Sequence, residues 1–289
     1  MIILDGATIA QKILEDLKKE KTSKNLSLAV VQVGENQVSL KYIAEKKRVA
    51  KDLGIGFRLM SYLSNVSQVI LIREIEKLGK DKKVSGIIVQ LPLPKHLDTQ
   101  SILDLIPSCK DVDVLSSVSF AEFALGTFPV LPPTVAAISL LLEQAKKNLE
   151  GIQVAVVGAG RLVGLPVSLW LVQQGAVVSL IQKETKDAPQ LIRKADIVIS
   201  GVGKAGLITG SMIKKGAVVI DAGTSVEGGP SARFARSGRQ AKLAGDVDFK
   251  SVSKKAGYLS PVPGGVGPLT VACLFHNLFS LSSKKFNAT

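Results

Sequence analysis

The sequence predicts an α/β protein with two domains, and three observations lead to this fold class. Short apolar, β-branched stretches alternate along the chain with segments that are apolar at helical spacing, as in parallel sheets covered by helices. The alternation is interrupted once, where Leu131-Pro-Pro133 precedes a long apolar helix expected over residues 134–145. A length of 289 residues is also sufficient for two hydrophobic cores.

The first half of the chain contains three predicted strands. They are expected over residues 27–33, 56–62 and 84–90, with helices over residues 7–19, 39–53 and 66–78. Because a helix connects each pair of strands, the strands are expected to be parallel. Ligands of such sheets bind at the carboxyl ends of the strands. Gly34 and Gln90 lie at such ends, so the turns there are candidate parts of a site.

The second half repeats the alternation. Strands are expected over residues 152–157, 177–181, 197–199 and 218–220, followed by a last apolar helix over 269–281. We therefore expect a first domain of residues 1–138, completed by the C-terminal helix of residues 268–289. The second domain is expected to comprise residues 139–267.

A glycine-rich turn, Gly158-Ala-Gly-Arg-Leu-Val-Gly164, joins the strand at 152–157 to a helix. Glycines let the backbone approach a pyrophosphate, and a helix N-terminus offers free N–H groups and a positive dipole end. The third glycine comes one residue later than in the standard dinucleotide-binding pattern. A tight turn without any ligand would also favour glycine, so the turn alone leaves both interpretations open.

The end of the second strand of this domain bears on the choice of cofactor. NAD sites place an acidic residue there, about 20 residues past the glycines, to hold the ribose hydroxyls. Here the stretch is Ile181-Gln-Lys-Glu184. Lys183, together with Arg161 in the turn, suits a 2′-phosphate and favours NADP. Glu184 would suit the bare ribose of NAD after a small backbone shift, so NAD is the less favoured alternative.

Ser39, Tyr42 and Lys46 follow one another at helical spacing and therefore share one face of a helix. A lysine next to a tyrosine on a helix is usually part of a solvated face. If that face instead lines a cleft, a partly desolvated Lys46 would act as a general base near neutral pH. The spacing leaves both interpretations open.

Two proline-containing stretches follow predicted strands. In Gly86-Ile-Ile-Val-Gln-Leu-Pro-Leu-Pro94, the prolines end the strand because they cannot donate to a sheet, and they would fix the Gln90 amide rigidly. A plain strand stop is the alternative. Pro261-Val-Pro-Gly-Gly-Val-Gly-Pro268 cannot form a regular element. It either passes close to a ligand or is an exposed linker.

The charge balance limits the classes of partner. A formal net charge of +13 favours acidic partners such as nucleic acid, an anionic membrane or phosphorylated and carboxylated small molecules. The lysines are spread along the chain and aromatic residues make up only 4%, so a stacking surface for single strands is poorly supplied. No apolar run is long enough to span a bilayer. We expect neither nucleic acid nor membrane as a partner.

Cysteines and histidines are too few for several classes of site. Cys109 and Cys273 cannot form a disulfide framework or a cysteine zinc site. His96 and His276 have no ligand-like partners and are expected to be surface or structural residues. We therefore expect no metal. The N-terminus lacks the order of a signal peptide, which makes the cytoplasm the expected compartment.

Taken together, these stretches resemble the bifunctional methylenetetrahydrofolate dehydrogenase/cyclohydrolase family along nearly the whole chain. The matching stretches are Ser39-x-x-Tyr42-x-x-x-Lys46, Gly86 to Pro94, Lys110-Asp-Val-Asp113, Gly158 to Pro166, Gly245-Asp-Val-Asp-Phe249 and Pro261 to Pro268. The resemblance implies an N-terminal folate-binding domain, a C-terminal Rossmann-like NAD(P)-binding domain and a homodimer. It also implies two reactions, which are NADP-dependent oxidation of 5,10-methylenetetrahydrofolate to 5,10-methenyltetrahydrofolate and hydrolysis of that product to 10-formyltetrahydrofolate.

The resemblance also implies roles for individual residues. Lys46 would be the main catalytic group of the hydrolysis, with Tyr42 packing on the folate, Gln90 tuning the lysine and Asp113 binding the pterin. The other expected substrate-binding residues are Ser39, Pro263, Gly264 and Gly265. The expected cofactor-binding residues are Gly158, Ala159, Gly160, Arg161, Gly164, Lys183 and Thr224.

The sequence departs from the family pattern at several places. They are Val114-Leu-Ser-Ser-Val-Ser119, Pro132-Pro-Thr134, Gln182-Lys183 and Gly203-Lys-Ala205. The catalytic set is intact, so activity is expected, but the surroundings of the pterin and of the adenine ribose are altered. One alternative is a family member that keeps only the dehydrogenase and uses NAD. An alternative from another class is a basic nucleotide-sensing protein that binds nucleic acid, which would leave Tyr42, Lys46 and Gln90 unexplained.

Overall fold

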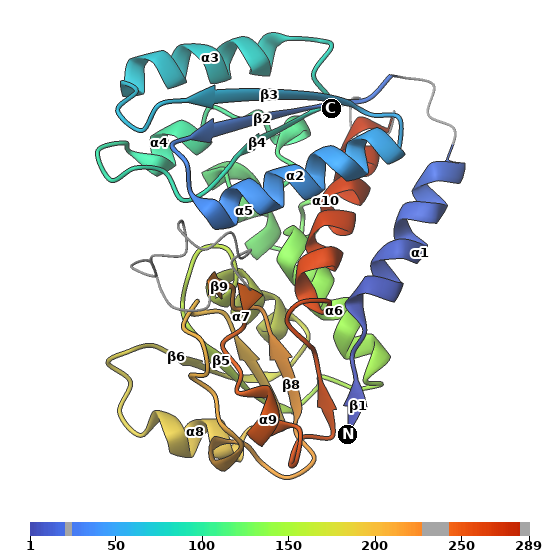
Figure 1. The fold of residues 1–289 in the computed structure, drawn as a ribbon, viewed down its shortest axis with the longest axis vertical. Coiled ribbons are helices and arrows are strands. Elements are labelled where there is room, and N and C mark those ends of the chain that lie inside the picture. Colours follow the sequence, from blue (N-terminus) through green and yellow to red (C-terminus); the bar gives the residue numbers. More distant parts are fainter. Residues whose placement is uncertain (21–24, 227–242, 284–289) are drawn as a thin grey trace, which may run out of the picture. The chain divides into compact units, whose positions relative to one another are not determined.

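A computed structural model describes residues 1–20, 25–226 and 243–283 (Figure 1). The chain divides into two compact units. We call Gln11–Pro133 with the chain from Val271 on the three-stranded unit, and Met1–Ala10 with Thr134–Thr270 the six-stranded unit. Within the described residues, no helix combines the length and apolar character needed to cross a membrane.

The three-stranded unit is built on a parallel sheet of order β3-β2-β4. Its strands are β2 (Ser27–Val33), β3 (Gly56–Tyr62) and β4 (Gly86–Val89). Its helices are α2 (Gln37–Asp52), α3 (Gln68–Lys80), α4 (Thr99–Leu103), the short 3-10 helix η1 (Ser108–Lys110), and α5 (Ser117–Ala124). Most of α1 (Gly6–Lys19) and α10 (Val266–Ser282) also belongs to this unit.

The core of this unit fills both faces of the central strand. On one face, Ala29 and Val31 of β2 pack in one cluster with Leu71 and Ile75 of α3. On the other face of the sheet, a Cβ on Gly86 of β4 would lie 2.7 Å from Leu278 Cδ1 of α10 and 3.3 Å from Leu28 Cδ1 of β2. The sequence of β2 is therefore almost entirely apolar, because both faces of this strand are buried.

The six-stranded unit contains a second parallel sheet, of order β1-β11-β8-β7-β5-β6. Its strands are β1 (Ile2–Ile3), β5 (Gln153–Val157), β6 (Val177–Ile181), β7 (Ile197–Ser200), β8 (Val218–Asp221) and β11 (Tyr258–Leu259). Its helices are α6 (Pro133–Gln144), α7 (Gly164–Gln173), α8 (Ala188–Lys194), the 3-10 helix η2 (Gly210–Met212) and α9 (Phe249–Val252). A separate antiparallel sheet consists of β9 (Ser225–Val226) and β10 (Leu243–Ala244).

The predicted α/β fold with parallel sheets is confirmed, and the first ten residues cluster with the six-stranded unit. They were expected in the first domain, yet Ile2 and Ile3 pair with Tyr258 and Leu259 of β11. The Ala7 backbone N–H donates to Gly264 O at 2.9 Å. The sequence did not indicate β1 or β11, because two-residue strands are too short to show a period.

Candidate functional site

A buried lysine is the central feature of the three-stranded unit. Asn36 caps α2 by accepting hydrogen bonds from the Val38 and Ser39 N–H groups, both at 3.0 Å, and this fixes where the helix begins. One face of α2 then carries Ser39, Tyr42 and Lys46. Lys46 is only 6% exposed, and its Nζ donates to Gln90 Oε1 at 3.0 Å. The interpretation of a solvated helix face is therefore wrong for Lys46.

Gln90 presents its oxygen to the lysine because its amide nitrogen is occupied elsewhere. The Gln90 backbone N–H donates to Val31 O at 2.9 Å, which continues the pairing beyond the end of β4. The side-chain Nε2 donates to Leu91 O at 3.0 Å. A carbonyl only accepts and an ammonium only donates, so Oε1 must face Lys46. Ser39 Oγ also donates to Leu91 O, at 3.2 Å, so α2 is tied to the same backbone.

Lys46 and Asp113 influence each other electrostatically. Burial lowers the pKa of Lys46, and the negative charge of Asp113 opposes this by raising it. Burial also raises the pKa of Asp113, an effect that Lys46 reduces and Asp111 reinforces. For both groups burial is the largest influence. The lysine therefore loses its proton closer to neutral pH than an exposed lysine does, which is what a proton acceptor requires.

The segment that carries Asp113 is held by its own neighbours. Lys110 Nζ donates to three carbonyls at the end of α3, those of Leu78, Gly79 and Asp81. The buried Asp111 carboxylate accepts from the backbone N–H groups of Leu115 and Ser116 at 2.8–3.1 Å. Lys110 and Asp111 therefore fix the backbone around Asp113.

In the six-stranded unit, the glycine-rich turn is explained by close packing at its two ends. Gly158 has a φ of +96°, and its N–H donates to Ile181 O at 2.8 Å. A Cβ on Gly164 would lie 1.6 Å from Gly158 O. The third glycine therefore comes one residue late because α7 begins directly against the backbone of the turn. By contrast, a Cβ on Gly160 would meet nothing within 4 Å, so internal packing does not require glycine there and the turn is open to a ligand.

The residues expected to determine the preference for NADP over NAD lie on exposed turns. Lys183 and Arg161 are both exposed. Lys183 lies in a tight turn in which the Thr185 N–H donates to Gln182 O at 3.1 Å. Because β5 and β6 are parallel neighbours, this turn and the glycine-rich turn lie at the same edge of the sheet. Thr224, which is half-buried, follows β8 at that edge.

The loop from Pro261 forms a packed turn within the six-stranded unit, and the expectation of an exposed linker is wrong for most of it. The Gly265 N–H donates to Pro261 O at 2.8 Å. A Cβ on Gly6 would lie 2.0 Å from Gly265 O, so the start of α1 lies directly against the loop. Pro263 is exposed and Gly264 is half-buried.

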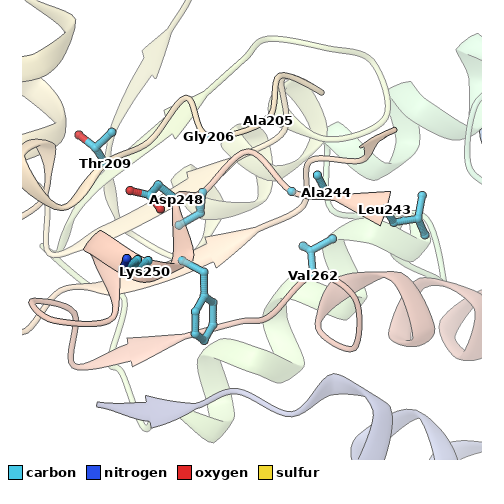
Figure 2. A pocket seen from close by; sticks show the side chains of 11 residues that line it. Ala205, Gly206, Thr209, Leu243, Ala244, Asp248, Lys250 and Val262 are labelled. Carbon is cyan, nitrogen blue, oxygen red and sulfur yellow. The ribbon is translucent and has the colours of Figure 1, made fainter. Parts of the chain in front are cut away.

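A cavity of about 440 Å³ lies elsewhere in the six-stranded unit. Thr209, Asp248 and Lys250 give it polar groups, and Leu243 and Val262 give it apolar ones (Figure 2). None of the residues expected to bind folate or cofactor lines this cavity. We therefore do not assign the site to it. Among the residues that the structure describes, no group of three or more His, Cys, Asp or Glu side chains is placed to hold a metal ion.

Asn277 contributes to the site region, although no sequence motif indicates it. Its Nδ2 donates to Val112 O at 3.0 Å and to Leu131 O at 2.9 Å. Asn277 is 2% exposed. From the distant helix α10 it holds the backbone of Val112, the residue that precedes Asp113. A single amide in a mostly apolar helix was the available signal, because a buried amide needs hydrogen-bond partners.

Comparisons with known proteins agree with this geometry. Residues 4–113 match the catalytic domain of the tetrahydrofolate dehydrogenase/cyclohydrolase family, and residues 132–286 match its NAD(P)-binding domain. The bifunctional protein FolD of Thermodesulfovibrio yellowstonii is 40% identical over 285 residues, which cover 95% of this chain and 94% of that protein.

Two solved structures are also similar over most of both chains. The bifunctional FolD methylenetetrahydrofolate dehydrogenase/cyclohydrolase of Campylobacter jejuni has a TM-score of 0.88 at 36% identity, covering 97% of this chain and 98% of that chain. The Trypanosoma brucei enzyme, solved with NADP and an inhibitor, has a TM-score of 0.90 at 32% identity, covering 97% and 96%.

Proposed function

This chain belongs to the tetrahydrofolate dehydrogenase/cyclohydrolase family, and from that premise we propose which of its residues act in each reaction. The chain is a bifunctional enzyme. It oxidises 5,10-methylenetetrahydrofolate with NADP and hydrolyses the resulting 5,10-methenyltetrahydrofolate to 10-formyltetrahydrofolate. We assign the hydrolysis to the three-stranded unit and the binding of NADP to the six-stranded unit.

The hydrogen bond that the buried Lys46 donates to Gln90 is the observation that supports the hydrolytic role most strongly. In this proposal neutral Lys46 accepts a proton as water attacks the carbon of the methenyl cation, and a C–O bond forms. The lysine then returns the proton to the departing N5 as the C–N5 bond breaks, and the hydroxyl group formed from the water loses its proton to solvent as it becomes the formyl C=O. One proton is released per turnover, which balances the charge of the cationic substrate. Gln90 keeps the Nζ in place throughout.

Substrate binding is proposed for further residues. Tyr42 and Ser39 occupy the same face of α2 as Lys46, which suits packing against a flat pterin. Asp113 is proposed to accept hydrogen bonds from the pterin. Pro263, Gly264 and Gly265 are proposed to contact the substrate from their packed turn.

The cofactor is proposed to bind at the glycine-rich turn. The N–H groups of Ala159 and Gly160 and the start of α7 at Gly164 suit a pyrophosphate, and Gly158, whose own N–H is bonded to Ile181 O, is proposed to let the cofactor approach the backbone of the turn. NADP supplies the hydride acceptor when it is bound. Arg161 and Lys183 are proposed to pair with its 2′-phosphate, because both are exposed at the same edge of the sheet. Thr224 is proposed to contact the cofactor from the loop after β8.

We propose a homodimer in which the surface around β3 contacts a second copy. β3 is the edge strand of its sheet (Figure 1), and edge strands present unpaired backbone groups. Leu59 on β3 is 41% exposed, Leu63 after it is 78% exposed, and Val69 at the start of α3 is 56% exposed. Apolar side chains gathered at an edge are typical of an interface. Light scattering would show a mass of two chains, whereas a monomer at micromolar concentration would contradict this.

The cytoplasm is the proposed location. Cys109 and Cys273 are both free thiols, which suits a reducing compartment. Nucleic acid and membrane are not proposed as partners. The net charge of +13 instead suits carboxylated and phosphorylated small molecules.

One assay tests the proposed pair of reactions and the choice of cofactor. Methylenetetrahydrofolate is supplied with NADP or with NAD, and reduced cofactor is followed by absorbance. Acid quenching converts the formyl product back to the absorbing methenyl form, so the total product is also measured. We expect faster reduction with NADP and little standing methenyl intermediate. Accumulation of methenyl would contradict the hydrolytic role, and faster reduction with NAD would contradict the role of Lys183.

A further inference from the structure

Two buried aspartates in the six-stranded unit have no part in the reactions described above. Asp221 ends β8 and is 3% exposed, and Asp246 lies in the stretch before α9 and is fully buried. Burying a carboxylate is costly unless several hydrogen bonds compensate for the lost water. The partners of these two carboxylates therefore indicate what the pair does.

Asp246 holds the loop that follows β7. Its Oδ2 accepts from Ser200 Oγ at 2.8 Å and from the Val202 N–H at 2.6 Å. Its Oδ1 accepts from the Lys204 N–H at 2.7 Å. Each carboxylate oxygen thus fixes a different part of the loop, and a charged acceptor makes these bonds stronger than neutral ones.

Asp221 in turn holds Asp246. Its carboxylate accepts from the backbone N–H groups of Gly223 and Asp246, both at 3.0 Å, and of Val247 at 2.9 Å. Burial raises the pKa of Asp221 to about 6, although its three backbone donors lower it. The two carboxylates therefore join three segments, which are the loop after β7, the loop after β8 and the stretch before α9.

The loop held by Asp246 lies directly against the glycine-rich turn. A Cβ on Gly158 would lie 3.0 Å from Gly201 O and 3.1 Å from Val202 Cγ2. A Cβ on Gly201 would lie 2.5 Å from Val163 Cγ1, at the other end of the turn. Any displacement of the loop would therefore displace the turn, because there is no free space between them.

We propose that Asp246 is a positioning residue for NADP, which acts through residues 201–204 on the glycine-rich turn, and that Asp221 orients Asp246. This inference rests on the proposed binding of NADP at that turn. The pair acts on the cofactor and has no part in the hydrolysis, since Lys46 and its hydrogen-bond partner belong to the other unit.

The test uses Asp246→Asn in the full-length enzyme. The amide keeps the size of the side chain but cannot accept from all three donors, because its Nδ2 only donates. We expect the KM for NADP to rise by about tenfold or more, as loss of charged hydrogen bonds to the loop predicts. Methenyl hydrolysis, measured without any cofactor, should stay within about twofold of wild type. Asp248→Asn is the matched control, with the same chemical change two residues away and no expected change in either activity.

The outcomes separate this inference from the proposed function. If wild type reduces no NADP, the proposed function fails. If wild type is active and Asp246→Asn keeps its KM for NADP, the inference fails. A merely structural role would lower both activities through loss of folded enzyme while leaving the KM for NADP unchanged, and that result would also overturn it. If Asp246→Asn does not fold, Ser200→Ala, which removes one donor and keeps the carboxylate, must raise the KM for NADP about twofold or more.

Discussion

The two candidate sites differ in what they are made of. In the three-stranded unit the proposed chemistry depends on side chains, above all the buried amine of Lys46 and the amide of Gln90. In the six-stranded unit the proposed cofactor site is a backbone surface, shaped by positions such as Gly158 and Gly164 where a side chain does not fit. Proton transfer needs a titratable group, whereas hydride transfer needs mainly alignment. The composition of each site follows from its reaction.

Buried charge is used differently in the two units. The pKa of Lys46 is lowered by burial, and its Nζ donates to the neutral amide of Gln90, so it can still exchange a proton. Asp246 accepts three hydrogen bonds and holds a loop in place. A buried ionisable group can thus transfer a proton only if its surroundings do not strongly stabilise either its charged or its neutral form. The predictions below test this distinction.

The largest effect is expected for Lys46→Met. Removing the amine should slow methenyl hydrolysis by about a thousandfold, the contribution typical of a general base. NADP binding and reduction should persist, because the glycine-rich turn lies in the other unit. Stopped-flow absorbance of methenyl decay and NADP titration would measure both. Lys47→Met, which removes an exposed neighbouring lysine, is the control and should behave as wild type.

Two glycine variants test the backbone site. Gly164→Ala should lower the free energy of unfolding by about 3 kcal/mol or more, because its Cβ has no space. Gly160→Ala should leave that free energy nearly unchanged, since a Cβ there meets nothing within 4 Å. It should nevertheless weaken NADP binding about tenfold by placing a methyl group where the pyrophosphate approaches. Denaturant unfolding and isothermal titration would measure the two effects, and unaltered NADP affinity in Gly160→Ala would argue against this turn as the cofactor site.

The smallest expected effect is a shift in a pH profile. Deprotonation of Lys46 should make hydrolysis faster as pH rises, with a midpoint below the ordinary lysine value of 10.5. The negative charge of Asp113 raises the pKa of Lys46. Asp113→Asn removes that charge and should therefore move the midpoint to lower pH. The profile of kcat, corrected for spontaneous hydrolysis, would check this, and a midpoint displaced to higher pH would show that the coupling has the opposite sign.

The sequence predicted the parallel α/β fold and the spacing of Ser39, Tyr42 and Lys46, because both depend on local periodicity. It left the burial of Lys46 open, since that depends on the end of β4 and on the segment around Asp113. It also missed Asn277, whose bond to Val112 joins residues 165 positions apart. It did not indicate β1 for the same reason, because β1 pairs with a strand near the other end of the chain.

The pKa of Lys46 is the quantity on which the account of the hydrolytic site depends most directly. Enzyme carrying lysine labelled with ¹³C at Cε would be titrated by NMR, and the Lys46 signal identified by its absence from Lys46→Met. We predict one lysine signal that titrates at lower pH than the exposed lysines and is missing from that variant. A Lys46 signal that titrates together with the exposed lysines would contradict the proposed role of Lys46 as the base.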